Sequence, residues 1–213
     1  MKPRRRGHRW AVVGILACTG VVAVVAGSLV GSGIDASATP RDLEGAAVAF
    51  EPGASPPPTS RSRAVDDEGM RLRAASHGLD VALGSLDSVD GEVTPPGFTS
   101  AYVVRDRSVA WDDASTGTVV VAMHALSGGS APGNAFIDPI TGETTVGAGD
   151  LIDVATRRYT VTQVRRVPKP DLAFDEDLWI PAAGRLIVIT CVPREGTAAR
   201  DNLVVIAQAT PTP

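Results

Sequence analysis

Downstream of its N-terminal region, the chain carries its apolar residues in short runs that are separated by Gly- and Pro-rich turns. Short runs rich in Val, Ile and Thr are typical of β-strands, and no long stretch has the period of an amphipathic helix. The last two runs are apolar at successive positions, as expected of strands buried on both faces. The pattern therefore predicts a mainly β domain, a small barrel or sandwich, with strands at Thr118–Met123, Leu151–Val154, Tyr159–Val167, Arg185–Cys191 and Asn202–Ala207.

The N-terminus carries a different pattern. Residues 10–30 form an uncharged stretch of 21 residues, which as a helix can span a hydrocarbon core of about 30 Å. Every basic residue before Asp35 lies ahead of this stretch, and no acidic residue precedes Asp35. By the positive-inside rule, residues 1–9 are a cytoplasmic stub, residues 10–30 are a single transmembrane anchor, and the rest is extracellular. We therefore expect the protein in the cell membrane.

Two other interpretations of the apolar stretch remain open. A cleaved signal peptide would use the small-x-small site Ala36-Ser37-Ala38, although the stretch is longer than the usual apolar region of about 7–15 residues. A lipoprotein would use Cys18, which lies in the middle of the stretch rather than at its edge. The length of the stretch favours an uncleaved anchor.

The chain beyond the anchor divides into a linker, a domain and a short tail. Residues 31–69 have no sustained period and are rich in Gly and Pro, which is typical of a disordered extracellular tether. Residues 70–209 are the predicted folded domain, which at about 140 residues is long enough to bury a core. Residues 210–213 are a disordered tail, because their prolines lack the N–H that a sheet requires.

Composition narrows the classes of function. The chain has 213 residues, a formal net charge of −4 and two cysteines. Two cysteines exclude a disulfide-rich scaffold and a four-cysteine zinc module. Without the basic residues ahead of Asp35, 15 basic residues face 24 acidic ones, a net charge of −9 that argues against nucleic-acid binding.

Cys191 is the only cysteine downstream of the apolar stretch. A lone extracellular thiol is a buried structural residue, an intermolecular link or a reactive group. Cys191 ends an apolar run and precedes Val192-Pro193, which puts it at the rim of the predicted sheet, where functional side chains are often displayed. A reactive thiol also needs a neighbouring base or cation, because its ordinary pKa is about 8.5.

Two further side chains occupy similar positions at strand ends. His124 directly follows a predicted strand, and Arg200 lies just ahead of the strand Asn202–Ala207. An imidazole there can act as acid and base toward Cys191, and a guanidinium can stabilise an oxyanion. The other extracellular histidine, His77, is interpreted as a turn residue. The predicted rim therefore holds one thiol, one imidazole and one guanidinium.

Several motifs from about Met70 to Ala209 occur together in a particular order. They are Asp90-Gly-Glu-Val-Thr-Pro-Pro-Gly-Phe98, Val121-Ala-Met-His124 before a Gly-rich loop, Gly149-Asp150-Leu-Ile-Asp-Val154, Leu186-Ile-Val-Ile-Thr-Cys191 and Arg200-Asp-Asn-Leu-Val-Val. In this order and spacing they resemble the sortases, the cysteine transpeptidases of Gram-positive cell surfaces. The last motif is most similar to the actinobacterial class F pattern, with class E close behind.

The resemblance implies a closed β-barrel of about eight strands with short helices, and a cysteine transpeptidase activity without a metal or organic cofactor. It implies that Cys191 is the nucleophile, His124 the acid and base, and Arg200 the group that stabilises the oxyanion or orients the substrate. Two positions depart from the family pattern. The gap between Cys191 and Arg200 is short, which leaves Arg194 as an alternative, and Val192-Pro193 stands where class F commonly has Gly-Gly.

The resemblance also implies partners. A sortase cleaves a Leu-Pro-x-Thr-Gly-like sorting signal after Thr, and an amine then resolves the thioacyl enzyme. The implied partners are surface proteins with C-terminal sorting signals, an amine acceptor on a cell-wall precursor or pilin, and membrane lipid through the anchor.

Substrate contacts are expected beside the thiol and in the loop Pro168–Gly184, which falls where the family has its variable substrate loop. The expected contacts are Thr190, Asn202, Leu172, Phe174 and Trp179. The loop also contains four acidic residues: Asp171, Asp175, Glu176 and Asp177. We interpret them as solvated, because their spacing is irregular; calcium binding is the alternative.

A different class of function also fits the sequence. The chain can be a tethered extracellular β-barrel or sandwich that binds a partner, with Cys191 as a merely structural residue. Among other wall-directed cysteine enzymes, L,D-transpeptidases use Ser-His-Gly-x-Cys, a pattern that this sequence does not contain.

Overall fold

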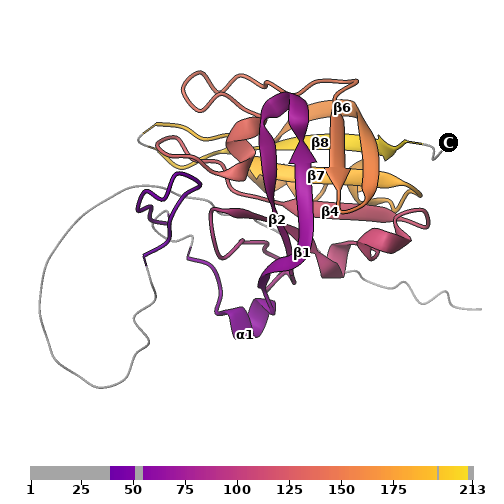
Figure 1. The fold of residues 1–213 in the computed structure, drawn as a ribbon, viewed down its shortest axis with the longest axis horizontal. Helices are drawn as coiled ribbons and strands as arrows, with labels where there is room; N and C mark the ends of the chain where they lie inside the picture. Colours follow the sequence, from indigo (N-terminus) through magenta and orange to yellow (C-terminus); the bar gives the residue numbers. More distant parts are fainter. Residues whose placement is uncertain (1–38, 51–54, 196, 211–213) are drawn as a thin grey trace, which may run out of the picture.

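The computed structural model describes residues 39–50, 55–195 and 197–210. Its main feature is a closed barrel of eight strands, with the two long C-terminal strands crossing behind the hairpin of the first two in Figure 1. The strands are β1 Val65–Ala74, β2 Leu79–Leu86, β3 Ser100–Val104, β4 Thr118–Ala122, β5 Leu151–Val154, β6 Arg157–Pro168, β7 Arg185–Cys191 and β8 Asp201–Ala209.

The order of the strands around the barrel is β1-β2-β3-β4-β7-β8-β6-β5, and β5 pairs with β1 to close it. Two neighbouring pairs are parallel, β2 with β3 and β4 with β7, and the other pairs are antiparallel. The parallel pair β4 and β7 is joined in register from Thr118↔Arg185 to Ala122↔Ile189. The C-terminal ends of β4 and β7 therefore meet at the same rim of the barrel.

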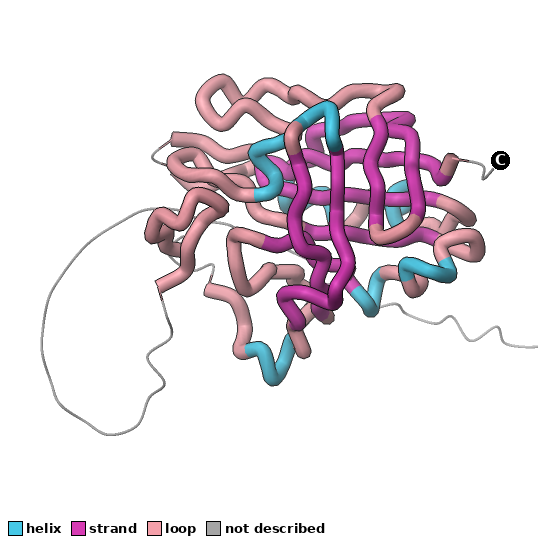
Figure 2. Tube along the Cα trace, in the orientation of Figure 1, coloured by secondary structure: helices cyan, strands magenta, loops and turns pink. Residues whose placement is uncertain are grey.

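The helices are short and lie outside the barrel, as the cyan segments of Figure 2 show. They are the α-helices α1 Thr59–Ser62, α2 Lys169–Leu172 and α3 Glu176–Trp179, and the 3-10 turns η1 Ala75–His77, η2 Arg105–Arg107, η3 Trp111–Asp113 and η4 Pro132–Ala135. Within the described ranges, none of them has the length and apolar character that crossing a membrane requires. The predicted anchor, residues 10–30, lies outside the described residues.

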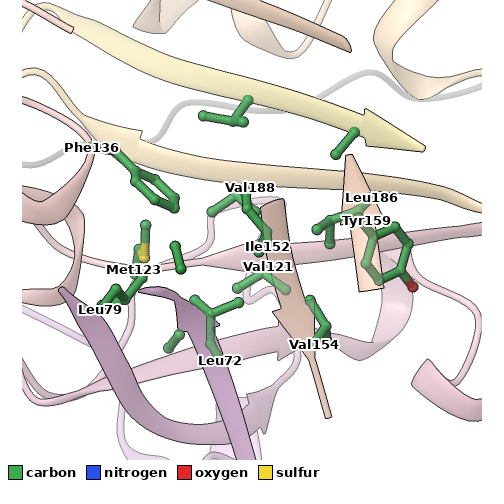
Figure 3. Close-up of a cluster of buried hydrophobic side chains, with 14 of the residues drawn as sticks. Leu72, Leu79, Val121, Met123, Phe136, Ile152, Val154, Tyr159, Leu186 and Val188 are labelled. Carbon is green, nitrogen blue, oxygen red and sulfur yellow. The ribbon is translucent and has the colours of Figure 1, made fainter. Parts of the chain in front are cut away.

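Alternating side chains divide the buried residues into two clusters. The larger cluster fills the barrel, and Figure 3 shows side chains from several strands converging there. The second cluster lies on the outer face of β4, β7 and β8, beneath Leu172 of α2 and Leu178 of α3. The inner residues of β4 and β7 are Val119, Val121, Leu186 and Val188, and the outer ones are Val120, Ala122, Ile187 and Ile189.

The structure confirms the predicted mainly β barrel and adds three strands to it. All five predicted runs form strands, and the additional ones are β1, β2 and β3. The first half of β1 is exposed and acidic, so it lacks the apolar run that marks a strand in a sequence. The shortest of the three, β3, has only five residues, too few for a clear period.

The ordered domain begins earlier than residue 70. Helix α1 and the start of β1 lie in residues 59–69, inside the predicted tether. Residues 39–50 also fold onto the barrel, where the backbone N–H of Leu43 donates to Ser130 O at 2.8 Å. The Asp42 carboxylate is buried and accepts a hydrogen bond from Ser130 N at 2.9 Å. The tether prediction therefore has to be corrected for these described parts, which contain α1, the start of β1 and a segment bonded to Ser130.

Candidate active site

The register of β4 and β7 brings the candidate thiol and imidazole together. Ala122 pairs with Ile189, and Met123 N donates to Ile189 O at 3.1 Å just beyond that pair. Two residues further along each strand lie His124 and Cys191. Because the strands run parallel and about 4.8 Å apart, the two side chains start from neighbouring backbone positions at one rim.

The same alternation places both side chains on the outer face of the sheet. His124 continues the outer positions of β4, and Cys191 continues the outer positions of β7. The intervening residue Met123 and the following residue Val192 belong to the interior cluster, which shows that the alternation persists to the rim. The thiol and the imidazole therefore share one face.

The imidazole of His124 is held by a loop that precedes β3. Its Nε2 lies 3.0 Å from the backbone oxygen of Pro95, and its ring packs on Phe98 with the centroids 4.6 Å apart. A carbonyl oxygen only accepts, so Nε2 carries the proton and Nδ1 is the basic nitrogen of the neutral ring. Phe50 from the N-terminal segment contacts the same ring, with the centroids 5.7 Å apart. His124 is consequently fixed and only 6% exposed.

Cys191 is the only cysteine of the described ranges and is 4% exposed. The loop that follows β4 folds back against the strand ends here, and Gly133 N donates to His124 O at 2.7 Å. A Cβ on Gly133 would lie 2.1 Å from Thr190 Oγ1, so glycine is required for this close approach. The loop after β4 therefore packs closely on His124 and on Thr190, the residue before Cys191.

Arg200 lies next to the end of β8 and is exposed. Asn202 pairs with Cys191, and Val192 N donates to Asp201 O at 2.9 Å, so Arg200 continues the strand pairing toward Pro193. Arg200 itself directly precedes β8. The structure therefore brings the backbone positions of the three predicted residues to one rim of the barrel.

The two substrate contacts predicted beside the thiol lie in different places. Asn202 is on the outer face opposite Cys191, is fully buried, and has no hydrogen-bond partner for its amide among the described residues. Thr190 is 2% exposed and alternates with Leu186 and Val188, so its side chain is on the inner face. Its hydroxyl also has no described partner.

The loop between β6 and β7 covers the outer face. Leu172 is buried in the outer cluster, whereas Phe174 is 64% exposed. Trp179 packs against the same cluster and donates from Nε1 to Leu172 O at 2.7 Å. Trp179 also lines a pocket of about 340 Å³ at the opposite end of β4 and β7 from Cys191. Of the three predicted contacts in the loop, only Trp179 lines this pocket.

One of the four acidic residues of this loop, Asp175, has structural partners. The Asp175 carboxylate caps α3 by accepting from Leu178 N and forms an ion pair with Arg165. In the part of the chain that the structure describes, no group of three His, Cys, Asp or Glu side chains is arranged to hold a metal ion.

His77 lies in the turn η1, as predicted, and pairs with Asp150 rather than with the rim residues. The distance between His77 Nε2 and the Asp150 carboxylate is 2.9 Å. The pKa of Asp150 lies below its usual range, first because Gly147 N donates to the carboxylate and then because of His77. This histidine stabilises a turn, which leaves His124 as the imidazole of the site.

The motif pattern did not identify the residues that hold His124. Pro95 and Phe98 lie in the segment Asp90–Phe98. This segment resembles a family segment, but its sequence does not predict that it contacts His124. Phe50 lies in the predicted tether. The only signal was an isolated aromatic residue in each segment, and a single aromatic residue does not predict which side chain it packs against.

The fold has counterparts among known structures. No protein-family model and no curated protein sequence matches this chain. Sortase C-1 from Actinomyces oris matches 67% of this chain and 73% of its own, with a TM-score of 0.51 and 14% identity. Sortase C-1 from Streptococcus pneumoniae matches 70% of each chain, with a TM-score of 0.51 and 16% identity. The likeness confirms the fold that the motifs implied: the described domain of this chain has the sortase fold.

Proposed function

We propose that the protein is a membrane-anchored cysteine transpeptidase that cleaves a Leu-Pro-x-Thr-Gly-like sorting signal and transfers it to a cell-surface amine. The observation that carries the proposal is the register of β4 and β7, which pairs Ala122 with Ile189, two residues before His124 and Cys191. The sortase fold and the position of Arg200 directly before β8, the neighbour of β7, support it.

In the proposed reaction, Nδ1 of His124 accepts the proton of the Cys191 thiol, and the thiolate attacks the carbonyl carbon of the scissile Thr–Gly bond. The guanidinium of Arg200 stabilises the oxyanion of the tetrahedral intermediate. The C–N bond then breaks, and His124 returns its proton to the leaving amine. An acceptor amine attacks the resulting thioester and loses a proton to His124; the C–S bond then breaks, and the Cys191 thiolate takes that proton back from His124.

The proposed substrates are surface proteins with C-terminal sorting signals, and the proposed acceptor is an amine on a cell-wall precursor or pilin. The anchor, residues 10–30, would keep the domain beside substrates that emerge from the membrane. The exposed acidic domain and its tether would then lie on the outer side.

One observation favours the alternative of a binding module with a structural cysteine. Cys191 is 4% exposed, and buried thiols are commonly inert. Alkylation distinguishes the two functions. A nucleophilic Cys191 is labelled by iodoacetamide with loss of activity, and mass spectrometry of the labelled peptide separates Cys191 from Cys18. A structural Cys191 resists labelling until the domain unfolds.

The decisive experiment measures cleavage of fluorogenic Leu-Pro-x-Thr-Gly and Leu-Ala-x-Thr-Gly peptides by the detergent-solubilised chain, with triglycine as acceptor. We expect Cys191→Ala and His124→Ala each to lower turnover by about 10³-fold or more. His77→Ala is the matched control, because His77 pairs with Asp150 rather than with Cys191 or His124, and it should retain turnover. Circular dichroism checks folding. Turnover by the folded Cys191→Ala chain would contradict the proposal.

The same assay assigns the arginine. Arg200→Lys keeps the charge but not the fork of donors, and we expect a loss of about 10- to 10³-fold. Arg194→Ala should retain activity, since Arg200 directly precedes β8 and Arg194 does not. Loss of activity in the Arg194 variant alone would reverse the assignment.

A further inference from the structure

The side-chain amide of Asn202 is a buried polar group without a structural contact. Asn202 is fully buried, and neither its Oδ1 nor its Nδ2 has a hydrogen-bond partner among the described residues. Buried polar groups in folded proteins are nearly always bonded, because an unpaired donor or acceptor has lost its hydrogen bonds to water and gained none in return. An orphaned amide therefore points to a partner that arrives during function.

The register of the sheet places this amide beside the candidate nucleophile. Asn202 of β8 pairs with Cys191 of β7, and in the next pair Val192 N donates to Asp201 O at 2.9 Å. Hydrogen-bonded and non-hydrogen-bonded pairs alternate along an antiparallel ladder, so Cys191 and Asn202 form a non-hydrogen-bonded pair. In such a pair the Cα atoms are only about 4.5 Å apart, and the two side chains lie closest together on their shared face.

The other neighbours of Asn202 on this face are apolar. Val167 of β6 pairs with Asn202 on the side away from Cys191, and Val204 is the next residue of β8 on the same face. Both valines belong to the outer cluster. The amide is therefore bordered by hydrocarbon along β6 and β8 and by the thiol across β7.

Attack by the thiol creates an acceptor at this position. The sulfur forms a bond to the carbonyl carbon, and the π electrons of the carbonyl move onto its oxygen, which becomes an oxyanion two bonds from Cys191 Sγ. Cys191 is itself only 4% exposed, so the acyl group has to gain access to the thiol in any case. Once the C–S bond has formed, the bond itself holds the oxyanion beside the residue that neighbours Cys191.

The amide is also free to respond. Because neither Oδ1 nor Nδ2 is bonded within the described residues, no such hydrogen bond has to break when the amino group turns toward the sulfur. A donor that is already in place and desolvated stabilises a developing charge more than a donor in water does. The buried, unpaired state of Asn202 therefore suits a donor to an oxyanion.

The positions of the strands also fit this role. The two neighbours of β7 in the barrel are β4, which ends before His124, and β8, which contains Asn202. In the proposed reaction His124 returns a proton to the leaving amine, so the leaving nitrogen faces β4. The oxygen is a different substituent of the same tetrahedral carbon and is left to face β8.

We propose that Asn202 is a further catalytic residue, whose Nδ2 donates a hydrogen bond to the oxyanion of the tetrahedral intermediates. No proton leaves the amide, and the hydrogen bond is given up when the carbonyl of the thioester re-forms. The inference rests on the proposed function and adds a neutral donor to the guanidinium that the function assigns to Arg200. It also specifies the predicted substrate contact of Asn202 as one made in the transition state.

The test variant is Asn202→Leu, which keeps a side chain of similar size without polar atoms. The full chain in detergent is assayed with a fluorogenic Leu-Pro-x-Thr-Gly peptide and triglycine. We expect kcat to fall by about 10²- to 10³-fold and KM to change by less than about 3-fold, because the lost hydrogen bond exists only in the transition state. Asn202→Ala, which adds no branched side chain, should show the same division between kcat and KM.

Alkylation by iodoacetamide separates this role from an effect on the thiol. The thiolate displaces iodide from a saturated carbon, so no oxyanion forms, and mass spectrometry follows the peptide that contains Cys191. We expect the rate in Asn202→Leu and its dependence on pH to stay within about 2-fold of the unmodified chain. A loss as large as the loss of peptide turnover would mean that Asn202 acts on the thiolate or on packing, and would overturn the assignment.

Asn134→Leu is the matched control for stability. The amide of Asn134, the only other asparagine of the chain, donates to Leu126 O at 2.7 Å and accepts from Ala131 N at 2.9 Å. We expect Asn134→Leu to lower the urea midpoint and Asn202→Leu to leave it unchanged or raise it, because only the first variant loses hydrogen bonds. Equal destabilisation would show that the Asn202 amide is bonded in the folded chain, and would overturn the inference.

The remaining outcomes separate this inference from the proposed function. Unchanged turnover in Asn202→Leu, or a rise in KM at constant kcat, would overturn the role of Asn202 alone. Absence of a thioacyl intermediate when the unmodified chain is given the peptide would overturn the proposed transpeptidase and this inference with it.

Discussion

At the residue scale, the candidate site depends on which face of a strand each side chain occupies. His124 and Cys191 are outer residues, and their neighbours Met123 and Val192 are inner residues. A shift of one residue in either strand would put the imidazole and the thiol on opposite faces of the sheet. The chemistry of the site is therefore a consequence of the register between β4 and β7.

A variant of Thr190 tests whether only side chains on the outer face take part in the reaction. Its side chain is on the inner face, and its buried hydroxyl has no described hydrogen-bond partner. Valine has nearly the same shape without the polar group, so Thr190→Val removes the cost of burying that hydroxyl. We expect Thr190→Val to leave the free energy of unfolding unchanged or to raise it by up to about 1 kcal/mol, with peptide cleavage retained.

Urea unfolding and the peptide-cleavage assay check both parts of this prediction. Thr190→Ser is the matched control: it keeps the hydroxyl but loses the methyl group, and should be less stable than Thr190→Val. If the valine variant were stable but inactive, the Thr190 hydroxyl would have to act on the substrate, as the family resemblance implies.

The sequence pattern located the strand-end residues but not the residues that position them. Cys191 and Arg200 flank long apolar runs, and such runs predict strands and their ends directly. Pro95, Phe98 and Phe50 lie in irregular segments, where no period relates a residue to its neighbour in space. Their contacts with His124 depend on long-range packing, which a local pattern does not contain.

At the element scale, β1 and β2 show how the barrel accommodates a polar strand. Their register shifts between Val65 and Met70, opposite the buried end of β2. A bulge of this kind lets the chain bend where the side chains of β1 are exposed. Gly84 of β2 lies under the irregularity, and a Cβ there would be 2.0 Å from the backbone oxygen of Val65. The glycine is therefore a packing requirement that the apolar pattern could not indicate.

Gly84→Ala is predicted to destabilise the barrel. The added methyl group meets backbone atoms of Val65 and Asp66, which cannot rotate away as a side chain can. We expect the free energy of unfolding to fall by about 1–3 kcal/mol or more, as for other overpacked sites. Urea titration followed by tryptophan fluorescence provides the measurement.

Gly147→Ala is the control for this prediction. A Cβ at Gly147 meets nothing within 4 Å. The control should change the unfolding free energy by less than about 0.5 kcal/mol, the usual range for a surface substitution. Equal effects of the two alanine variants would show that β1 moves freely away from β2, contrary to the described contact.

At the scale of the whole molecule, the barrel could be predicted because most of its strands are apolar, but the residue at which the domain begins could not. The C-terminal strands β7 and β8 are adjacent in the barrel and contain long apolar runs. The N-terminal part joins through polar contacts, such as the buried carboxylate of Asp42 with the backbone of Ser130. In the sequence, the residues that make such contacts look like those of a linker, because Asp, Ser and Gly are also typical of disordered chains.

Carboxylates with such contacts also set the response of the whole domain to acid. The pKa of Asp153 is below its usual range, first because Arg158 donates to the carboxylate, and the pKa of Asp80 is lowered mainly by Arg71. The backbone N–H of Gly147 and then His77 lower the pKa of Asp150. Each group binds its proton more weakly in the folded chain than in the unfolded chain. Each therefore stabilises the fold above pH of about 4, the usual pKa of an aspartate.

This stabilisation should be lost as the pH falls through the lowered folded-state pKa values, because the unfolded chain takes up protons first. We expect the urea midpoint to change little between pH 7 and pH 5 and to fall steeply below pH of about 4. Asp150→Asn removes one such carboxylate, so the variant should be less stable at pH 7 and show a smaller drop toward pH 3. The control Asp90→Asn affects a carboxylate that is 78% exposed and that pairs, among the described residues, with Arg61 at the surface. If both variants kept the full acid-induced drop, the contacts of Asp150 with Gly147 and His77 would contribute nothing to the pH dependence, and the drop would have to come from the net charge of the domain.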